Sequence, residues 1–440
     1  MSVIEPLMPA SASLPMDDAV GRVALRKAAW RLIPLLALGY GIAYMDRVNI
    51  SFAALQMNRD LHFSASIYGF GAGLFFVSYA ACEVPSNLLL YRVGARRWFA
   101  RIMLTWGLLA MGMMFVKTPL QFYVMRFLLG MAEAGFFPGV IFYLAQWFPV
   151  HMRARAISRF YVSLPLASVF TGAIAGALLD LQGKAGLAGW QWLFLLEGLP
   201  AVVLSIVFLV YLPVGPAQAK WLTEDEREWI VHRLSKDVTG DGHGLNFGRA
   251  LLDHRVWQVS IVFLCMLTCS YAYTFSAPLI LKTITGFNNR DVGFLVALMN
   301  VLGAPAMIVN AMHSDRTRER YFHVVIPFLL MCVGYLIGGL SIAPFLAVPA
   351  LAIASISYYA LQGPLLALAT SFLHGRSAAA AIAAMNTIGI LGGFVGPFGM
   401  GLAKDYTGAY QPGLLVLVIP SLVAAATIYM MRFQARAVSR

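Results

Sequence analysis

Four charged residues lie inside stretches of sequence that are otherwise apolar. Asp46 and Arg47 are adjacent, and Arg126 and Glu133 are seven residues apart. A charged side chain at the centre of a bilayer costs roughly 2.5–3.5 kcal/mol even on the mildest scale, so a chain that keeps several there has a use for them. Arginines can neutralise an anionic solute, and desolvated carboxylates can take up protons. These residue types therefore indicate movement of a charged solute across a membrane.

The spacing of these residues limits which of them can meet. A separation of seven residues is two helical turns, about 10.5 Å along the axis, so Arg126 and Glu133 cannot bond each other in a straight helix. Asp46 and Arg47 point about 100° apart, so at most one of them faces Arg126 directly. Two interpretations follow: a structural ion-pair network between two helices, or a site in which Arg47 and Arg126 bind an anion while Asp46 and Glu133 carry protons. We take the second as the leading hypothesis.

The elements that position these residues follow from the composition. Of 440 residues, 60% are hydrophobic and only 12% are charged, against roughly 45–50% apolar and 25% charged in soluble domains. Runs of about 20 apolar residues predict membrane-spanning helices. The sequence predicts an all-α membrane protein with twelve transmembrane helices, at about 31–54, 66–90, 99–117, 120–147, 157–179, 192–212, 256–281, 291–312, 323–342, 347–373, 378–402 and 413–432.

The longest polar stretch divides the twelve helices into two bundles of six. It contains Thr223 and Glu226 in a capping-box pattern, which predicts a surface helix that ends near Gly240. The predicted organisation is a cytoplasmic N-terminal segment (1–30), an N-terminal six-helix bundle (31–212), a cytoplasmic linker (213–255), a C-terminal six-helix bundle (256–432) and a cytoplasmic tail (433–440).

The distribution of basic residues predicts the orientation. An even number of spans places both termini on one side, and 24 of the 32 Lys and Arg residues fall on that side. Short loops rich in Lys and Arg stay in the cytoplasm, so both termini are predicted to be cytoplasmic. The net charge of +12 then follows from topology and requires no nucleic-acid partner. The first 30 residues show no pattern of a removable signal peptide.

Several classes of protein are disfavoured by what the sequence does not contain. It has neither the Gly-x-x-x-x-Gly-Lys-Ser/Thr phosphate loop nor the Gly-x-Ser-x-Gly nucleophile elbow. An ATP-driven pump and an enzyme are therefore not expected. Cysteines in apolar helices are most simply buried hydrophobes. We expect no cofactor and no metal, a monomeric protein, and membrane lipid, a small organic anion and protons as its partners. The four cysteines are Cys82, Cys265, Cys269 and Cys332.

The second half of the chain offers uncharged polar residues in place of buried charges. Some of them serve helix packing, as is common in membrane proteins. The asymmetry nevertheless suggests that the first half handles charge while the second hydrogen-bonds a neutral, hydroxylated part of the solute. These residues are Tyr271, Tyr273, Thr274, Ser276, Asn300, Asn310, Tyr358, Tyr359, Gln362, Thr370, Ser371, Asn386 and Thr387.

Several motifs resemble the anion:cation symporter family of the major facilitator superfamily, over about residues 20–432. The segments from Phe127 to Trp147 and from Gly189 to Phe194 are most similar to bacterial tartrate and hydroxyphenylacetate permeases. The motifs that carry the resemblance are Tyr44-Met-Asp-Arg-Val-Asn-Ile-Ser51, Glu83-Val-Pro-Ser-Asn87, Gly94-Ala-Arg-Arg-Trp98, Arg126-Phe-Leu-Leu-Gly-Met-Ala-Glu-Ala-Gly-Phe-Phe-Pro-Gly139 and Ser314-Asp-Arg316.

This resemblance implies the major facilitator fold, a bacterial inner membrane and proton-coupled uptake of organic anions such as sugar acids, dicarboxylates or aromatic acids. It implies proton coupling by Asp46 and Glu133 and carboxylate binding by Arg47 and Arg126. The further substrate-binding candidates are Tyr44, Tyr79, Tyr271, Gln362, Ser371 and Asn386.

Three positions depart from the family pattern, and all lie in the second half. Ser276 stands where the family usually has Trp, Asn300 follows Met299 where Pro-Tyr is common, and Ile390 stands where Asn is frequent. The departures leave the identity of the anion open. The predicted mechanism is alternating access by a proton:organic-anion symporter. The alternatives are an exporter of drugs or metabolites that runs in antiport with protons, and a membrane sensor without flux.

Overall fold

The computed structural model describes residues 15–238, 254–341, 343–371 and 377–438. Within these ranges the regular elements are helices, and no strand is present. Twelve helical segments are long and apolar enough to cross a membrane, which confirms the predicted fold class. In chain order they are formed by α1 (Pro15–Val48) with α2 (Ile50–Asp60), α3 (Ala65–Val93), α4 (Ala95–Gly112), α5 (Pro119–Glu133) with α6 (Phe136–Ala145), α7 (Val150–Tyr161) with α8 (Ser163–Leu179), α9 (Gly189–Tyr211), α12 (His254–Thr285), α13 (Asn289–Thr317), α14 (Phe322–Leu340), α15 (Pro344–Ser371), α16 (Ser377–Ile390) with α17 (Gly392–Thr407), and α18 (Gln411–Val438).

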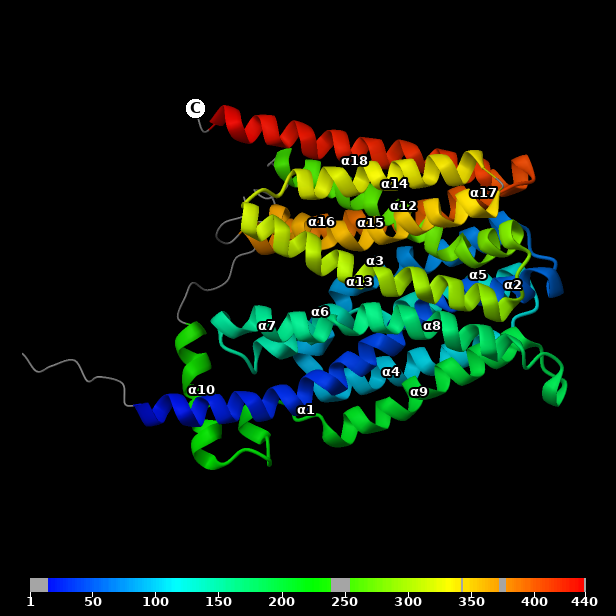
Figure 1. The fold of residues 1–440 in the computed structure, drawn as a ribbon. Coiled ribbons are helices and arrows are strands. Elements are labelled where there is room, and N and C mark those ends of the chain that lie inside the picture. The colour runs from blue at the N-terminus through cyan, green and yellow to red at the C-terminus, as the bar shows by residue number, and fades with distance from the viewer. Residues whose placement is uncertain (1–14, 239–253, 342, 372–376, 439–440) are drawn as a thin grey trace, which may run out of the picture.

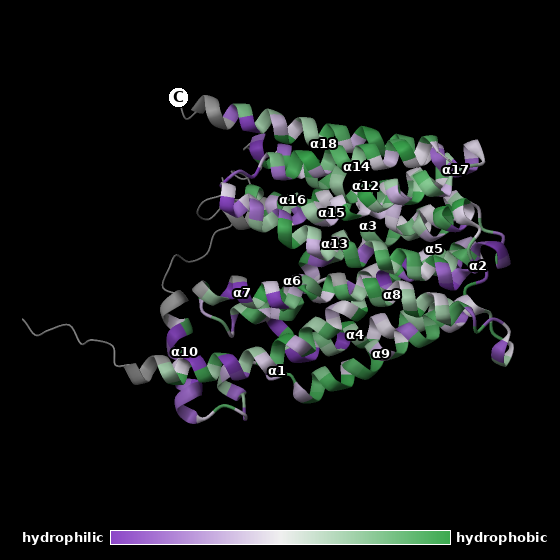
Figure 2. Ribbon diagram, viewed as in Figure 1, coloured by the Kyte–Doolittle hydropathy of each residue, from purple (hydrophilic) through white to green (hydrophobic). Residues whose placement is uncertain are grey.

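The helices form two bundles that lie side by side, one built from α1 to α9 and the other from α12 to α18 (Figure 1). Each bundle has its own cluster of buried hydrophobic side chains. Green, hydrophobic residues dominate the long helices, and purple, hydrophilic residues gather toward their ends (Figure 2). This arrangement suits a bilayer, whose apolar interior meets the helix bodies and whose surfaces meet the ends.

One break in the first bundle lies beside a charged residue. The first span passes from α1 to α2 at Asn49, whose backbone stays helical (φ −56°, ψ −30°). The fourth is interrupted directly after Glu133, where Gly135 has a φ of +88° that only glycine adopts without strain. Ser86 of α3 donates a hydrogen bond of 2.6 Å to the carbonyl of Ala134 at this break. Broken spans within a protein interior leave polar backbone and side-chain groups available at membrane depth.

The two bundles contact each other closely at the end opposite the chain termini. There α8 packs on α13 and α3 packs on α17. A Cβ atom on Gly172 would lie 2.6 Å from the carbonyl oxygen of Gly293, so the first contact depends on glycine. Asp405 of α17 accepts hydrogen bonds from the backbone N–H groups of Ala65 (3.0 Å) and Ser66 (2.8 Å) at the start of α3. The carboxylate of one bundle thus caps a helix of the other.

The surface helix predicted after the first bundle is α10 (Glu224–Val238). The capping box is formed as expected: Glu226 Oε2 accepts from the N–H of Thr223 at 3.0 Å, and Thr223 Oγ1 accepts from that of Glu226 at 3.3 Å. Lys27 of α1 forms an ion pair of 2.6 Å with Glu226. The helix therefore docks on α1, at the end of the molecule where α1 begins and α18 ends (Figure 1). Gly240, the predicted end of this helix, lies outside the described residues.

Candidate functional site

Arg47 and Glu133 form an ion pair that joins α1 to α5, and both side chains are almost fully buried. The break in the fourth span after Glu133 and the position of Arg47 in the last turn of α1 bring them together. Neither group is saturated: Nε of Arg47 and Oε2 of Glu133 have no hydrogen-bond partner among the described residues. The pair therefore keeps one donor and one acceptor that a solute or a proton could use.

Arg126 lies two helical turns before Glu133, on the same face of α5. Its guanidinium donates to the backbone carbonyls of Gly71 (3.4 Å) and Ala72 (3.2 Å) on α3. The same group lies 4.9 Å from the ring centroid of Phe75, a cation–π arrangement. Arg126 also lies within electrostatic range of Glu133, but its hydrogen bonds are to backbone. As the helical spacing predicts, Arg126 and Glu133 do not bond each other.

Asp46 faces a different side from Arg47. Its Oδ2 accepts a hydrogen bond of 2.6 Å from Nε1 of Trp106 on α4, and its Oδ1 lies 3.4 Å from Nδ2 of Asn49. Asp46 is 2% exposed. Asp46 therefore bonds side chains inside the first bundle, whereas the adjacent Arg47 forms the ion pair with α5.

Aromatic residues from both bundles surround Arg47. Its guanidinium lies 5.4 Å from the ring centroid of Phe75 and 5.3 Å from that of Tyr79. Tyr271 of α12 is within electrostatic range of the same guanidinium and packs its ring 4.3 Å from that of Phe76. Two of the predicted substrate-binding residues, Tyr79 and Tyr271, are therefore placed beside Arg47, one from each bundle.

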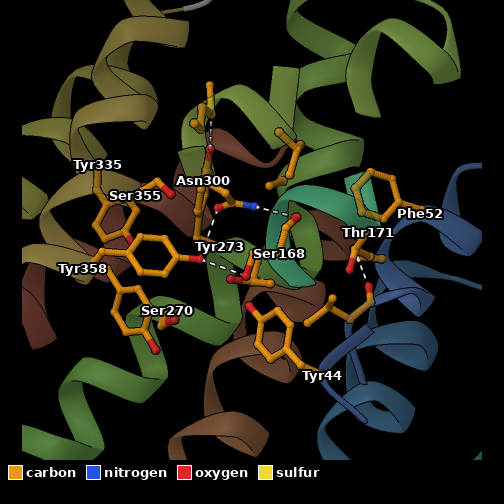
Figure 3. A pocket seen from close by; sticks show the side chains of 17 residues that line it. Tyr44, Phe52, Ser168, Thr171, Ser270, Tyr273, Asn300, Tyr335, Ser355 and Tyr358 are labelled. Atoms are coloured by element: carbon orange, nitrogen blue, oxygen red, sulfur yellow. Dashed lines mark hydrogen bonds between the residues drawn. The ribbon is translucent and has the colours of Figure 1, made fainter. Parts of the chain in front are cut away.

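A pocket lined by hydroxyl, aromatic and aliphatic side chains lies next to this group, between the two bundles (Figure 3). Helices of the first bundle contribute hydroxyl groups from Tyr44, Ser51, Ser168 and Thr171, and the described residues of the lining include no Asp, Glu, Lys or Arg. The second bundle supplies a wall of hydroxyl and aromatic side chains. The residues of this wall are Ser270, Tyr273, Thr274, Asn300, Tyr335, Ser355, Tyr358 and Tyr359, together with Ala277, Val296 and Met299.

Hydrogen bonds inside the pocket link the two bundles. The hydroxyl of Tyr359 donates to Ser168 Oγ (3.2 Å) or to Oδ1 of Asn300 (3.3 Å). Nδ2 of Asn300 donates to the carbonyl oxygen of Ser168 at 3.3 Å. Figure 3 shows the side chains of Asn300 and Ser168 on facing sides of the pocket. Because hydroxyls both donate and accept, such a lining can exchange these bonds for bonds to a hydroxylated solute.

Three predicted substrate-binding residues are not brought to this pocket. Gln362 and Ser371 follow Tyr359 on α15, and Ser371 lies 12 residues, or about 18 Å, further along the helix axis. Ser371 is exposed and donates 2.7 Å to the carbonyl of Leu368. Asn386 of α16 is also exposed and instead lies 3.5 Å from Glu83 of α3. None of these three side chains is among the described residues that line the pocket.

The three departures from the family pattern have different surroundings. Asn300 lines the pocket and takes part in its hydrogen bonds. Ser276 is buried in α12, and Ile390 is buried at the end of α16, and neither lines the pocket. Of the three, Asn300 is therefore the one placed to affect which solute fits.

The sequence interpretation missed the hydroxyl groups of the first bundle. Ser51, Ser168 and Thr171 line the pocket, but single Ser and Thr residues in apolar helices usually serve packing. A signal was available in α8, where Ser168 and Thr171 are three residues apart and so share one face. Buried Glu197 of α9, which lies within electrostatic range of Asp46 and whose carboxyl oxygens have no hydrogen-bond partner among the described residues, was also not among the predicted site residues.

Comparison with known proteins agrees with this architecture. The family model described as the Major Facilitator Superfamily matches residues 36–397. An Agrobacterium vitis protein named "Putative tartrate transporter" is 45% identical over 93% of this chain and 91% of its own length. An Acinetobacter baumannii protein named "Quinolone resistance transporter" is 40% identical over 92% of this chain and 94% of its own length.

A solved structure shares the fold at low sequence identity. It is a bacterial homologue of the human lysosomal transporter Spinster in an inward-facing and occupied conformation. The TM-score is 0.76 at 16% identity, with 91% of this chain and 96% of that chain covered. The fold and the relatives are those of multi-pass membrane transporters and not of enzymes. This chain belongs to the major facilitator superfamily.

Proposed function

We propose that this transporter takes up a small organic anion together with protons by alternating access. The observation that carries the proposal is the buried Arg47–Glu133 ion pair, which has a free donor on Arg47 and a free acceptor on Glu133. The names of the tartrate transporter relatives support an organic anion as the class of solute. Tartrate, other hydroxylated acids, sugar acids and aromatic acids are the candidates.

The ion pair suggests how proton and anion binding are coupled. A proton on Glu133 removes the charge that Arg47 neutralises, so the guanidinium becomes available to a carboxylate of the solute. The aromatic rings of Phe75 and Tyr79 would then hold Arg47 in place through cation–π contacts. Loss of the proton restores the ion pair and expels the anion. Arg126, in electrostatic range of Glu133, would add a second positive charge for the same carboxylate.

The pocket beside the ion pair suits the uncharged part of the solute. Its hydroxyl groups can bond hydroxyls of the solute, and its aromatic rings can pack against carbon atoms. Because the described residues of its lining include no Lys or Arg, the carboxylates of a solute such as tartrate would be bound at Arg47 and Arg126 and not in this pocket. We assign Tyr44, Asn300 and Tyr359 to solute binding, with Tyr79 and Tyr271 beside the carboxylate.

The positive-inside bias supports a cytoplasmic location for both termini and for α10. The bundles contact each other at the opposite end, through α3 with α17 and α8 with α13. Transport then requires that these contacts open while the cytoplasmic end closes, with the site reached from each side in turn.

Reconstitution into proteoliposomes tests the proposal. With an acidic exterior, the protein is expected to accumulate labelled tartrate or a sugar acid, and a protonophore should abolish the accumulation. The solute is first chosen by thermal-shift screening of the purified protein against a panel of sugar acids, tartrate and aromatic acids. Uptake that does not depend on the pH gradient but requires Na⁺ would reject proton coupling.

The second candidate is export in antiport with protons. The name of the Acinetobacter baumannii relative favours it. The same vesicles distinguish the two mechanisms. In an antiporter the solute and the protons cross the membrane in opposite directions, whereas in a symporter they cross in the same direction.

A further inference from the structure

Glu83 is a buried acid that neither the ion pair nor the pocket uses. It begins the Glu83–Asn87 motif and lies on α3. Phe75, Tyr79 and Glu83 follow one another at intervals of four residues, so they share one face of the helix. The rings of Phe75 and Tyr79 make the cation–π contacts of Arg47. Glu83 therefore lies about 6 Å beyond Tyr79 along the axis, between the charged site and the end of the molecule where α1 begins.

Helix α3 packs along the second bundle, antiparallel to α16 and α17. At the closed end of this seam glycine lies against backbone: a Cβ atom on Gly69 would lie 2.3 Å from the carbonyl oxygen of Pro397. About 21 Å further along α3, the partners are instead two polar side chains, Glu83 and Asn386. The successive pairs along the seam are Gly69 with Pro397, Gly73 with Phe394, Phe76 with Gly393 and Glu83 with Asn386.

The polar contact of the seam is long. Nδ2 of Asn386 donates to Oε2 of Glu83 at 3.5 Å, whereas most N–H···O bonds measure about 2.9–3.0 Å. Asn386 is exposed and Glu83 is buried, so one side of this contact is accessible. Closer approach of α16 to α3 at this end would shorten the bond and cover Asn386.

Asn386 provides the side-chain hydrogen bond of Glu83 in the part of the chain that the structure describes. Asn87 donates to the backbone carbonyl of Glu83 at 2.9 Å and not to its carboxylate. Arg47, the cation of this face, is paired with Glu133. A buried carboxylate without a donor is unfavourable, so Glu83 favours conformations in which α16 lies close to α3 at this end.

We propose that Glu83 and Asn386 form a gate contact between the bundles, at the end of the molecule where α1 begins. Their hydrogen bond tightens when this end closes and lengthens when it opens. Glu83 is then a positioning residue for α16 and not a ligand of the solute. Asn386, which the sequence predicts as a substrate-binding residue, is assigned to the gate contact. The inference rests on alternating access, which is part of the proposed function.

An exchange of the two polar groups tests the gate contact. Asn386→Asp places a second carboxylate beside Glu83, and the two like charges repel. In the double variant Glu83→Gln/Asn386→Asp the amide and the carboxylate have exchanged helices, so the hydrogen bond can form again. The control is Thr387→Asp. It adds the same charge at an exposed neighbouring position, whose side chain points about 100° away from that of Asn386.

The measurement is the distance between nitroxide labels at Arg92 of α3 and Arg316 of α13, which are both exposed, in the full-length protein in liposomes without solute. The ratio of the short-distance to the long-distance population should fall about 10-fold in Asn386→Asp, the change that one hydrogen bond to a charged group produces. The double variant should restore most of the wild-type ratio, and Thr387→Asp should leave it unchanged.

A double variant no closer to the wild type than Asn386→Asp, or an equal shift in Thr387→Asp, would overturn the gate contact. If Asn386→Asp does not fold, Asn386→Ala removes the donor without adding a charge, and an unchanged ratio in that variant would overturn it as well. A single label distance shared by the wild type and every variant would instead reject alternating access. Because the label distances require neither a proton gradient nor a solute, the two failures are distinguishable.

Discussion

At the scale of residues, the adjacent Asp46 and Arg47 bond different partners because neighbouring side chains on a helix point in different directions. Arg47 pairs with Glu133 across two helices, and Asp46 bonds Trp106 inside the bundle. Removing one partner of a buried ion pair typically costs about 3–5 kcal/mol, because the other charge remains unpaired. Substitutions here must therefore be judged on stability and on transport together.

Arg126 is expected to bind the carboxylate of the solute. A charged hydrogen bond contributes about 1.5–3 kcal/mol, so Arg126→Ala should weaken solute binding roughly 10- to 100-fold. Lys keeps the charge but lacks the planar fork of the guanidinium, so Arg126→Lys should restore binding only in part. Isothermal titration with the solute found by screening measures both variants. Wild-type affinity in Arg126→Ala would leave this arginine as a link between α5 and the backbone of α3.

The two carboxylates are expected to serve the proton and not the solute. Glu133→Gln and Asp46→Asn resemble the protonated forms, so both should bind solute and fail to accumulate it against a gradient. Exchange of labelled solute is expected to persist in one of them, since exchange does not require the empty, deprotonated carrier to return. The measurement compares melting temperature, affinity and driven uptake in the same protein. A Glu133→Gln variant that melts early and binds nothing would assign Glu133 to the architecture.

At the scale of elements, α10 shows how a polar segment is attached to a membrane bundle. The capping box starts the helix, and Lys27 of α1 pairs with Glu226 in its first turn. The ring of Trp229 packs where a side chain on Gly21 of α1 would have to lie, so the two helices approach closely. The attachment of α10 to α1 thus includes the ion pair between Lys27 and Glu226 and the close contact of Trp229 with Gly21.

Acidification should weaken this attachment. Burial would raise the pKa of the Glu226 carboxyl, but the hydrogen bonds and charge of Lys27 and the bonds with Thr223 outweigh burial and hold that pKa below its usual range. The pKa of the Glu226 carboxyl is lower in the docked helix than in the undocked chain, where it is about 4.3, so its ionisation stabilises docking at pH values above about 4.3. This stabilisation is lost as the pH falls through the pKa of the docked carboxyl. Trp229 fluorescence should therefore change below about pH 4.3.

The matched variants are Glu226→Gln and Glu224→Gln. Glu226→Gln removes the ion pair and should increase amide hydrogen exchange in α10 at neutral pH, whereas Glu224 is exposed and its substitution should have little effect. Equal exchange in the two variants would mean that the ion pair does not hold α10 on α1.

At the scale of the whole molecule, the closed end depends on close helix contact between the bundles. Gly172 and Gly293 bring α8 and α13 together, and Asp405 caps the start of α3. These contacts must separate for the site to open toward this end. Small residues at a helix interface let the two helices approach closely, and no bulky side chains interlock to hold the helices together.

Gly172→Val should favour the conformation that is open at this end, because a Cβ atom there would lie 2.6 Å from the carbonyl oxygen of Gly293. Driven uptake should fall, and the distance between nitroxide labels at Lys184 and Tyr406 should increase. Gly399→Val is the control, since a Cβ atom at Gly399 meets nothing within 4 Å. An unchanged label distance in Gly172→Val would show that this contact does not determine which end is closed.

The sequence by itself determined the class of fold and the chemistry of the charged residues. Twelve apolar runs are readable because a bilayer requires about 20 apolar residues per helix, and the capping box of α10 is readable because it depends on residues three apart. Charged residues within apolar runs stand out for the same reason: their cost in the membrane makes them rare. The family motifs added the expected roles of these residues.

The contacts between side chains of different helices could be identified only from the tertiary structure. Helical spacing shows that Arg126 and Glu133 cannot bond each other, but it does not identify Arg47 as the partner of Glu133, which depends on how α1 packs on α5. The same is true of the pocket. Ser168 and Asn300 are 132 residues apart and form a hydrogen bond, whereas Gln362 and Ser371, which have similar polarity, are not among the residues that line the pocket. Contacts between distant segments follow from helix packing, which local patterns of polarity do not encode.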